Sequence, residues 1–141
     1  MPVSVLSRVA RPGIRADRLA RVVEHVLRRE GAPVNASVTV VLVTDAATRR
    51  LNRRFLGKDR ATDVLAFPGD PPSLGDIAIS VERARAQARR AGHPMAVEIA
   101  LLAAHGALHL LGYDDRTRGH RADMMRRQRA LLGELGIEVR G

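Results

Sequence analysis

Two histidines and an aspartate have the types and the spacing of a metal site. His105 and His109 lie four residues apart in an apolar run that begins at Pro94, a spacing that puts both rings on one helix face. Gly112 ends this helix and lets the backbone turn sharply, so that Asp115 can return a carboxylate to the same point. Three protein ligands leave one position for water, which is the catalytic arrangement of zinc. The pattern therefore predicts one zinc ion per chain, held by these three side chains.

The histidine pair is also compatible with a core role and with a peptidase. A histidine on an apolar helix face is often a core residue with satisfied hydrogen bonds, but the glycine and carboxylate at fixed spacing favour the metal site. The same spacing of two histidines, a glycine and a third ligand occurs in metzincin peptidases, which carry a glutamate as general base directly after the first histidine. Gly106 stands at that position here. A peptidase with this sequence would lack the group that deprotonates its water.

Length and composition limit the classes of protein to which this chain can belong. A chain of 141 residues fits one domain, so we expect residues 1–141 to form a single unit with its own core. The chain has no cysteine, which excludes disulfides and thiolate ligands and fits a reducing compartment. Residues 1–15 contain no continuous apolar segment of the secretory type, and Glu98 argues against a membrane span in the apolar run. We expect a cytoplasmic protein with no membrane partner.

The charge of the chain favours a polyanionic partner. The formal net charge is +9, and cations placed on phosphates release condensed counterions. Dispersed surface charge or an arginine-rich genome composition could account for the same excess. Aromatic residues make up only 2% of the chain, which argues against a base-stacking platform for single strands.

Four basic residues are the candidates for contacting such a partner. Arg53, Arg54 and Lys58 belong to the densest basic cluster in the first half of the chain. This cluster could equally be a solvated helix face. Arg121 follows the metal motif closely, so it could hold a phosphate-bearing substrate over the metal.

Hydrophobic periodicity predicts four strands and five helices. The strands are expected over residues 3–9, 37–43, 63–67 and 74–80, and the helices over residues 17–31, 46–55, 82–91, 94–111 and 119–135. In the last helix we expect an apolar seam of Met124, Leu131 and Leu135, with Met125 and Leu132 beside it. This order of elements predicts an α+β fold, a small mixed β-sheet of about four strands packed with helices. The histidine helix is expected to be central.

Three segments of the chain resemble a known family in their order and spacing. Residues 51–67 (LNRRFLGKDRATDVLAF), 74–80 (LGDIAIS) and 105–115 (HGALHLLGYDD) are similar to the YbeY family of bacterial rRNA maturation factors. The resemblance implies a metal-dependent, single-strand-specific endoribonuclease that matures the 3′ end of small-subunit (16S) rRNA and acts in ribosome quality control. It further implies RNA and the small ribosomal subunit as partners, and a zinc ion held by three histidines.

The sequence departs from this family pattern at two positions. The family's third histidine falls on Asp115, whose oxygen binds zinc at nearly the distance of an imidazole nitrogen. The more anionic site would make its water less acidic and favour manganese or magnesium. His120 is the alternative third ligand. Leu56 stands where the family commonly has an arginine linked to activity, and Arg53 or Arg54 could replace that arginine in space.

The leading hypothesis is therefore an endoribonuclease whose metal polarises a phosphate oxygen while arginines neutralise the charge that develops. The sequence leaves open whether water or the ribose 2′-oxygen attacks phosphorus. No side chain is an obvious general base, so metal-bound hydroxide would have to act largely alone. A second hypothesis is a non-catalytic ribosome assembly or RNA-binding factor with a structural metal. A zinc metallopeptidase is the third, and Gly106 counts against it.

Overall fold

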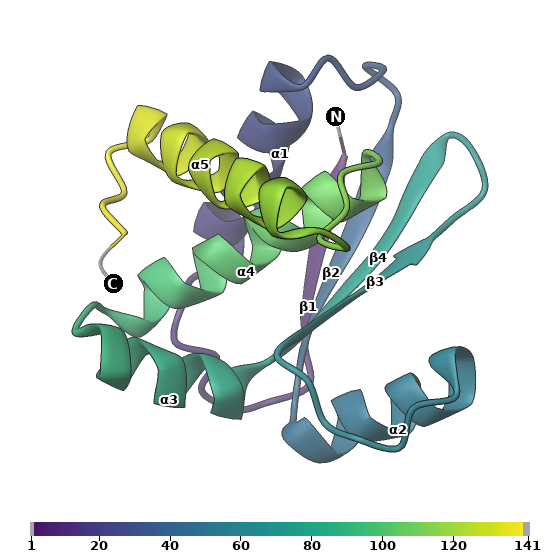
Figure 1. Ribbon diagram of the computed structural model, residues 1–141, viewed down its shortest axis with the longest axis vertical. Helices are drawn as coiled ribbons and strands as arrows, with labels where there is room; N and C mark the ends of the chain where they lie inside the picture. Colours follow the sequence, from purple (N-terminus) through teal and green to yellow (C-terminus); the bar gives the residue numbers. More distant parts are fainter. Residues whose placement is uncertain (1, 140–141) are drawn as a thin grey trace.

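Four strands and five helices follow one another within residues 2–139, the part of the chain that the computed structural model describes (Figure 1). In chain order they are β1 (Val3–Ser7), α1 (Ala16–Arg29), β2 (Ser37–Val43), α2 (Asp45–Leu56), β3 (Val64–Pro68), β4 (Ser73–Ser80), α3 (Val81–Ala91), α4 (Met95–Leu110) and α5 (Arg118–Glu134). The order agrees with the sequence prediction. β1 is shorter than predicted because the Ser7 hydroxyl donates to the carbonyl oxygen of Val9 at 2.7 Å, and the backbone bends there.

The strands form one mixed sheet in the order β1-β2-β4-β3. β2 pairs in parallel with β1 and β4, while β3 pairs antiparallel with β4 and forms an edge of the sheet. Side chains of β2 point alternately to the two faces of the sheet. Val38, Val40 and Leu42 therefore lie in the main core, and Val43 lies in a smaller cluster. The predicted α+β class with a small mixed sheet is confirmed.

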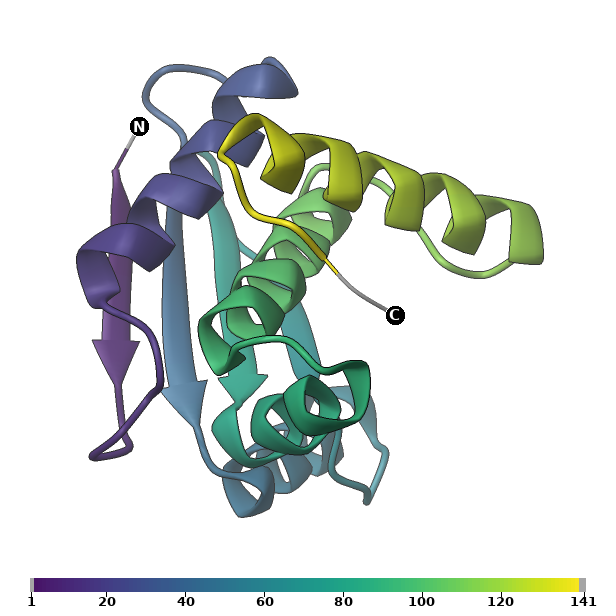
Figure 2. The ribbon, with the colours of Figure 1, turned by 90° about the vertical axis from the view of Figure 1, so that its left-hand side faces the viewer.

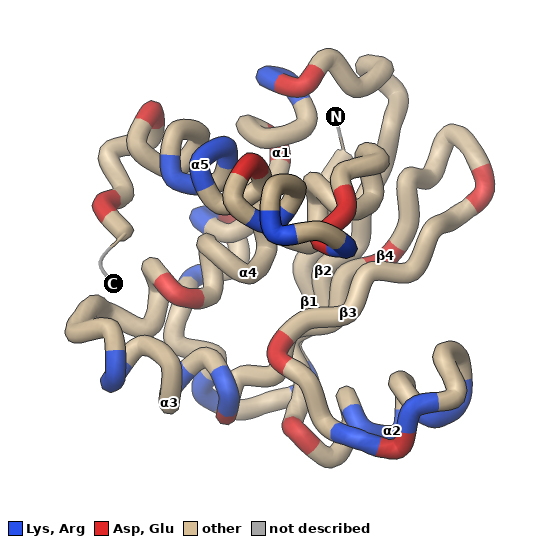
Figure 3. Tube along the Cα trace, viewed as in Figure 1, with Lys and Arg blue, Asp and Glu red and all other residues tan. Residues whose placement is uncertain are grey.

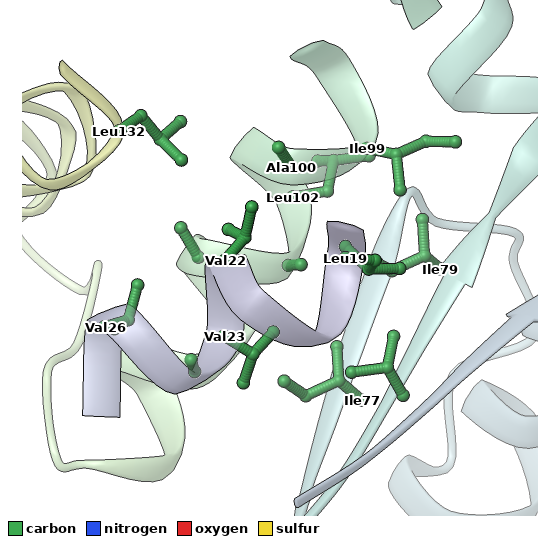
Figure 4. Close-up of a cluster of buried hydrophobic side chains, with 14 of the residues drawn as sticks. Leu19, Val22, Val23, Val26, Ile77, Ile79, Ile99, Ala100, Leu102 and Leu132 are labelled. Atoms are coloured by element: carbon green, nitrogen blue, oxygen red, sulfur yellow. The ribbon is translucent and has the colours of Figure 1, made fainter. Parts of the chain in front are cut away.

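Helices cover both faces of this sheet. α1 and α4 lie on one face with α5 packed on them, and α2 lies on the opposite face (Figures 1 and 2). Figure 4 shows the main core between α1, α4 and β4, where Leu19, Val23, Ile77 and Ile99 are fully buried. Burial of such aliphatic side chains contributes about 1.5–3 kcal/mol each.

Gly106 lets the helix that carries both histidines, α4, pack closely against the sheet. α4 contacts α1, α3, α5, β3 and β4. Gly106 permits the close approach to β4, since a Cβ atom there would lie 2.7 Å from Cγ2 of Ile77. Among the described helices, α4 included, none has the length and apolar character needed to cross a membrane.

α5 buries three of the five residues of its predicted seam and one residue that was not predicted. Met124, Gln128, Leu131 and Leu132 are buried, whereas Met125 and Leu135 are exposed. The buried positions follow the helical spacing i, i+4, i+7 and i+8, and Leu135 lies at the C-cap beyond the last turn. The prediction was wrong for Met125, which lies outside this spacing, and for Leu135, which lies beyond the last turn; it omitted Gln128 because the side chain is polar.

Candidate metal centre

Three ligand atoms converge at the C-terminal end of α4. The Nε2 atoms of His105 and His109 lie 3.0 Å apart, and Oδ2 of Asp115 lies 3.9 Å from the first and 3.6 Å from the second. Ligand atoms about 2.0–2.1 Å from a tetrahedral zinc are about 3.3 Å from one another. The observed separations bracket this value. The donor set of two imidazoles and one carboxylate also suits a divalent metal, so these three residues could hold one ion.

The loop after α4 carries Asp115 back to the histidines and is anchored at Tyr113. Gly112 adopts a φ of +104°, which permits the reversal of the chain. The Tyr113 hydroxyl donates to Oε1 of Glu30 at 3.0 Å, and Nε of Arg127 donates to the same oxygen at 2.7 Å. The third ligand is therefore positioned by contacts that reach both α1 and α5.

Gln128 of α5 orients the ring of His105. The Gln128 side chain is buried, and its Oε1 lies 2.8 Å from Nδ1 of His105. Because an amide oxygen only accepts, the His105 Nδ1–H is the donor, which leaves the lone pair of Nε2 for a metal. Burial lowers the pKa of His105, and the hydrogen bond to Gln128 offsets part of that effect. The ring stays in its neutral, metal-binding form to a lower pH than free histidine.

Sequence reasoning missed Gln128. One glutamine in an arginine-rich helix carries no motif, and a polar residue is usually assigned to the surface. The signal that could have found it is its spacing, four residues after Met124 and three before Leu131 in the buried seam.

His120, the alternative third ligand, does not lie with the three candidate ligands. Its Nδ1 lies 2.7 Å from Oδ1 of Asp114, and its side chain is 56% exposed. The Arg116 backbone N–H and then His120 hold the pKa of Asp114 below its usual value. Among the described residues, the group that can hold a metal contains Asp115 and does not contain His120.

The ligand atoms face a cavity of about 420 Å³ at the edge of the sheet. Its walls are the C-terminal end of α4, Asp115, residues 62–66 and Pro68, so they include most of β3. The side chains of His105, His109 and Asp115 are 25%, 27% and 49% exposed, so a metal held there would be accessible from solvent. A structural zinc site is normally closed, which favours a catalytic role.

The four predicted substrate contacts lie in different places. Lys58 lines a second cavity next to the metal-site cavity. Arg121 donates from Nη1 to the carbonyl oxygen of Asp115 at 3.0 Å, so it lies beside the third ligand. Arg53 and Arg54 instead line a separate hollow on α2. Figure 3 shows basic residues along α2 and α5, with β3 between these two helices.

Leu56 lines the second cavity, where the resemblance led us to expect an arginine. Neither Arg53 nor Arg54 lines that cavity. The guanidinium of Arg54 lies over the ring of Phe55, 5.2 Å from its centroid. The two arginines are thus not placed to replace the family's arginine, whereas Lys58, Arg60 and Arg83 bring cations to the same cavity.

Comparison with known proteins agrees with the motifs. Residues 9–136 match the family described as Endoribonuclease YbeY. The chain belongs to the YbeY family. An Endoribonuclease YbeY of Solibacter usitatus is 50% identical over 124 residues, which cover 87% of this chain and 80% of the relative. That of Moorella thermoacetica is 44% identical over 133 residues, 84% of this chain and 85% of the relative.

A solved structure extends the agreement to the fold. The solution structure of TM1509 from Thermotoga maritima is similar with a TM-score of 0.63 at 25% sequence identity. The match covers 95% of this chain and 91% of the Thermotoga protein. The predicted membership of the YbeY family is confirmed, and the similarity extends over nearly all of the described α+β fold.

Proposed function

We propose that this chain is a metal-dependent endoribonuclease that cleaves single-stranded RNA and uses zinc. The observation that carries the proposal is the convergence of His105, His109 and Asp115 on a solvent-accessible cavity beside basic residues. The relatives named Endoribonuclease YbeY support the same chemistry. When bound, the metal supplies a Lewis acid that polarises a phosphate oxygen and lowers the pKa of water.

The residues of the chain itself have three tasks in this proposal. His105, His109 and Asp115 hold the metal and leave part of its surroundings open to substrate. Lys58 and Arg121 neutralise charge on the RNA backbone at either side of the site. Gln128, through its hydrogen bond, keeps the His105 ring in the tautomer that binds a metal.

We extend the proposal to the biological substrate on the strength of family resemblance. The substrate is the 3′ end of small-subunit (16S) rRNA, and the small ribosomal subunit in the cytoplasm is the partner. Residues 1–141 act as a single endoribonuclease domain. The formal net charge of +9 suits contact with ribosomal RNA.

The peptidase alternative finds no support at Gly106. The position where metzincins carry their glutamate faces Ile77 of β4, and even a methyl group there would lie 2.7 Å from that side chain. A glutamate there would require the Ile77 side chain or α4 to shift.

Cleavage of a labelled single-stranded RNA tests the proposal, with a duplex and a DNA of the same sequence as controls. We expect zinc-loaded wild type to cleave the single strand, His109→Ala and Asp115→Ala to lose cleavage, and His120→Ala to retain it. A 2′,3′-cyclic phosphate on the products identifies the ribose oxygen as nucleophile, and a plain phosphate identifies water. RNA that is bound tightly but never cleaved would favour the assembly factor with a structural metal.

A further inference from the structure

A second cavity adjoins the metal-site cavity around the start of β3. It has a volume of about 430 Å³ and shares three lining residues with the first cavity, namely Thr62, Asp63 and Leu65. The rest of its wall comes from the end of α2, the loop that follows α2, and α3. A single-stranded RNA that lies in the metal-site cavity can therefore continue into the second cavity across residues 62–65.

The cations of this second cavity are largely free of counter-charges. Within residues 2–139, neither Lys58 nor Arg60 has a carboxylate oxygen within 4.0 Å. Arg83 also lines the cavity and pairs with Asp45 at 3.2 Å. Asp63 in the shared wall is the carboxylate that faces the same space. The balance of charge on the wall is positive, which suits an anionic ligand.

The segment that presents these cations is fixed by hydrogen bonds to α2. Nδ2 of the buried Asn52 donates to the carbonyl oxygen of Arg60 at 3.0 Å, and the Asn52 backbone carbonyl accepts from the Lys58 backbone N–H at 3.2 Å. Thr48 Oγ1 accepts from the backbone N–H of Thr62 at 3.4 Å. A loop held in this way loses less conformational entropy when a ligand binds than a free loop would.

We propose that this cavity is a second nucleotide subsite, in which Lys58 and Arg60 bind the backbone phosphate next to the phosphate at the metal site. Guanidinium binds phosphate through parallel hydrogen bonds and ammonium binds it as a point charge, so the pair suits one phosphate group. The half-exposed Leu56 supplies an apolar edge for the sugar or base. The proposal rests on the proposed function, because it assumes that RNA occupies the metal site.

The test compares two double variants by their affinity for RNA. Lys58→Ala/Arg60→Ala removes the two subsite cations that have no carboxylate partner. Arg18→Ala/Arg28→Ala removes two likewise exposed arginines from α1, which packs on β1 at the opposite edge of the sheet from β3. The ligand is a short single-stranded RNA with 2′-O-methyl riboses, and its binding is followed by fluorescence anisotropy at several salt concentrations. We expect the first variant to bind the RNA about tenfold more weakly. The slope of log affinity against log salt concentration should be smaller by about 0.7 for each phosphate that its cations no longer neutralise. The α1 variant should bind like wild type.

An uncharged methylphosphonate at a single position locates the phosphate that is bound. When the methylphosphonate stands next to the cleaved position, we expect it to weaken the binding of RNA to wild type. It should not weaken the binding of RNA to Lys58→Ala/Arg60→Ala any further. Equal losses in the two double variants, or additive losses from the methylphosphonate, would overturn the subsite. Cleavage of unmodified RNA by wild type is scored separately, so a failure of the subsite is distinguishable from a failure of the endoribonuclease proposal.

Discussion

Replacement of Gln128 by leucine should weaken metal binding although Gln128 is not itself a ligand. The substitution keeps the volume of a side chain that is only 2% exposed, but it removes the acceptor 2.8 Å from Nδ1 of His105. The unpaired Nδ1–H then costs about 1–3 kcal/mol, and the ring is free to adopt the other tautomer. Loss of such a supporting hydrogen bond typically reduces metal affinity about 10- to 100-fold. The His105 side chain is partly exposed, so water can replace some of the bond, and we expect the lower half of that range.

Competition with a chromogenic zinc chelator measures this effect on wild type, Gln128→Leu and Gln128→Glu. The glutamate variant retains an acceptor for Nδ1–H, so its zinc affinity at neutral pH should equal or exceed that of wild type. Thermal unfolding of the metal-free proteins shows whether either variant has lost its fold. A folded Gln128→Leu protein with unchanged zinc affinity would refute the role that we assign to Gln128.

Three further predictions concern the ligand set, the packing of α4 and a surface ion pair. Asp115→His should bind zinc at least as tightly as wild type and manganese less tightly, measured by chelator competition, because imidazole is the softer ligand. Gly106→Ala should lower the free energy of unfolding by about 1–3 kcal/mol in denaturant titrations, because its Cβ would lie 2.7 Å from Ile77; an unchanged midpoint would contradict the packing. Hydrogen bonding to Arg29, and then to His25, lowers the pKa of Glu134 from 4.5 to about 2, so the stabilising effect of the ionised carboxylate is complete above pH 4.5 and disappears as the pH falls through 2. The melting temperatures of Glu134→Gln and wild type should therefore differ at pH 6 and converge in strong acid, whereas a difference that persists in strong acid would rule out the ion pair as its cause.

Much of the fold is predictable because local preference and burial agree along most of the chain. The β-branched segment 37–43 forms β2 with the bounds predicted. Gly92 adopts a positive φ at the C-cap of α3, directly after the predicted end of that helix. The helical spacing of the two histidines and the glycine turn predicted that Asp115 returns to them, and its Oδ2 lies 3.6 Å from Nε2 of His109.

The surroundings of the site were less predictable because they depend on contacts between distant segments. Gln128 meets His105 across 23 positions of sequence, through the packing of α5 on α4. Their proximity to Leu56 in sequence suggested that Arg53 or Arg54 could replace the family's arginine in space, but both line a different hollow on α2. No periodic pattern specifies which loop cations face the cavity next to the metal-site cavity.

Metal content of the purified protein tests the central claim most directly. Elemental analysis of untagged wild type, Asp115→Ala and His120→Ala compares the proposed third ligand with its neighbour in sequence. We predict about one zinc per chain in wild type and in His120→Ala, and loss of zinc in Asp115→Ala. Zinc retained in Asp115→Ala and lost in His120→Ala, or a wild type that takes up no zinc when it is supplied, would contradict the metal centre described above.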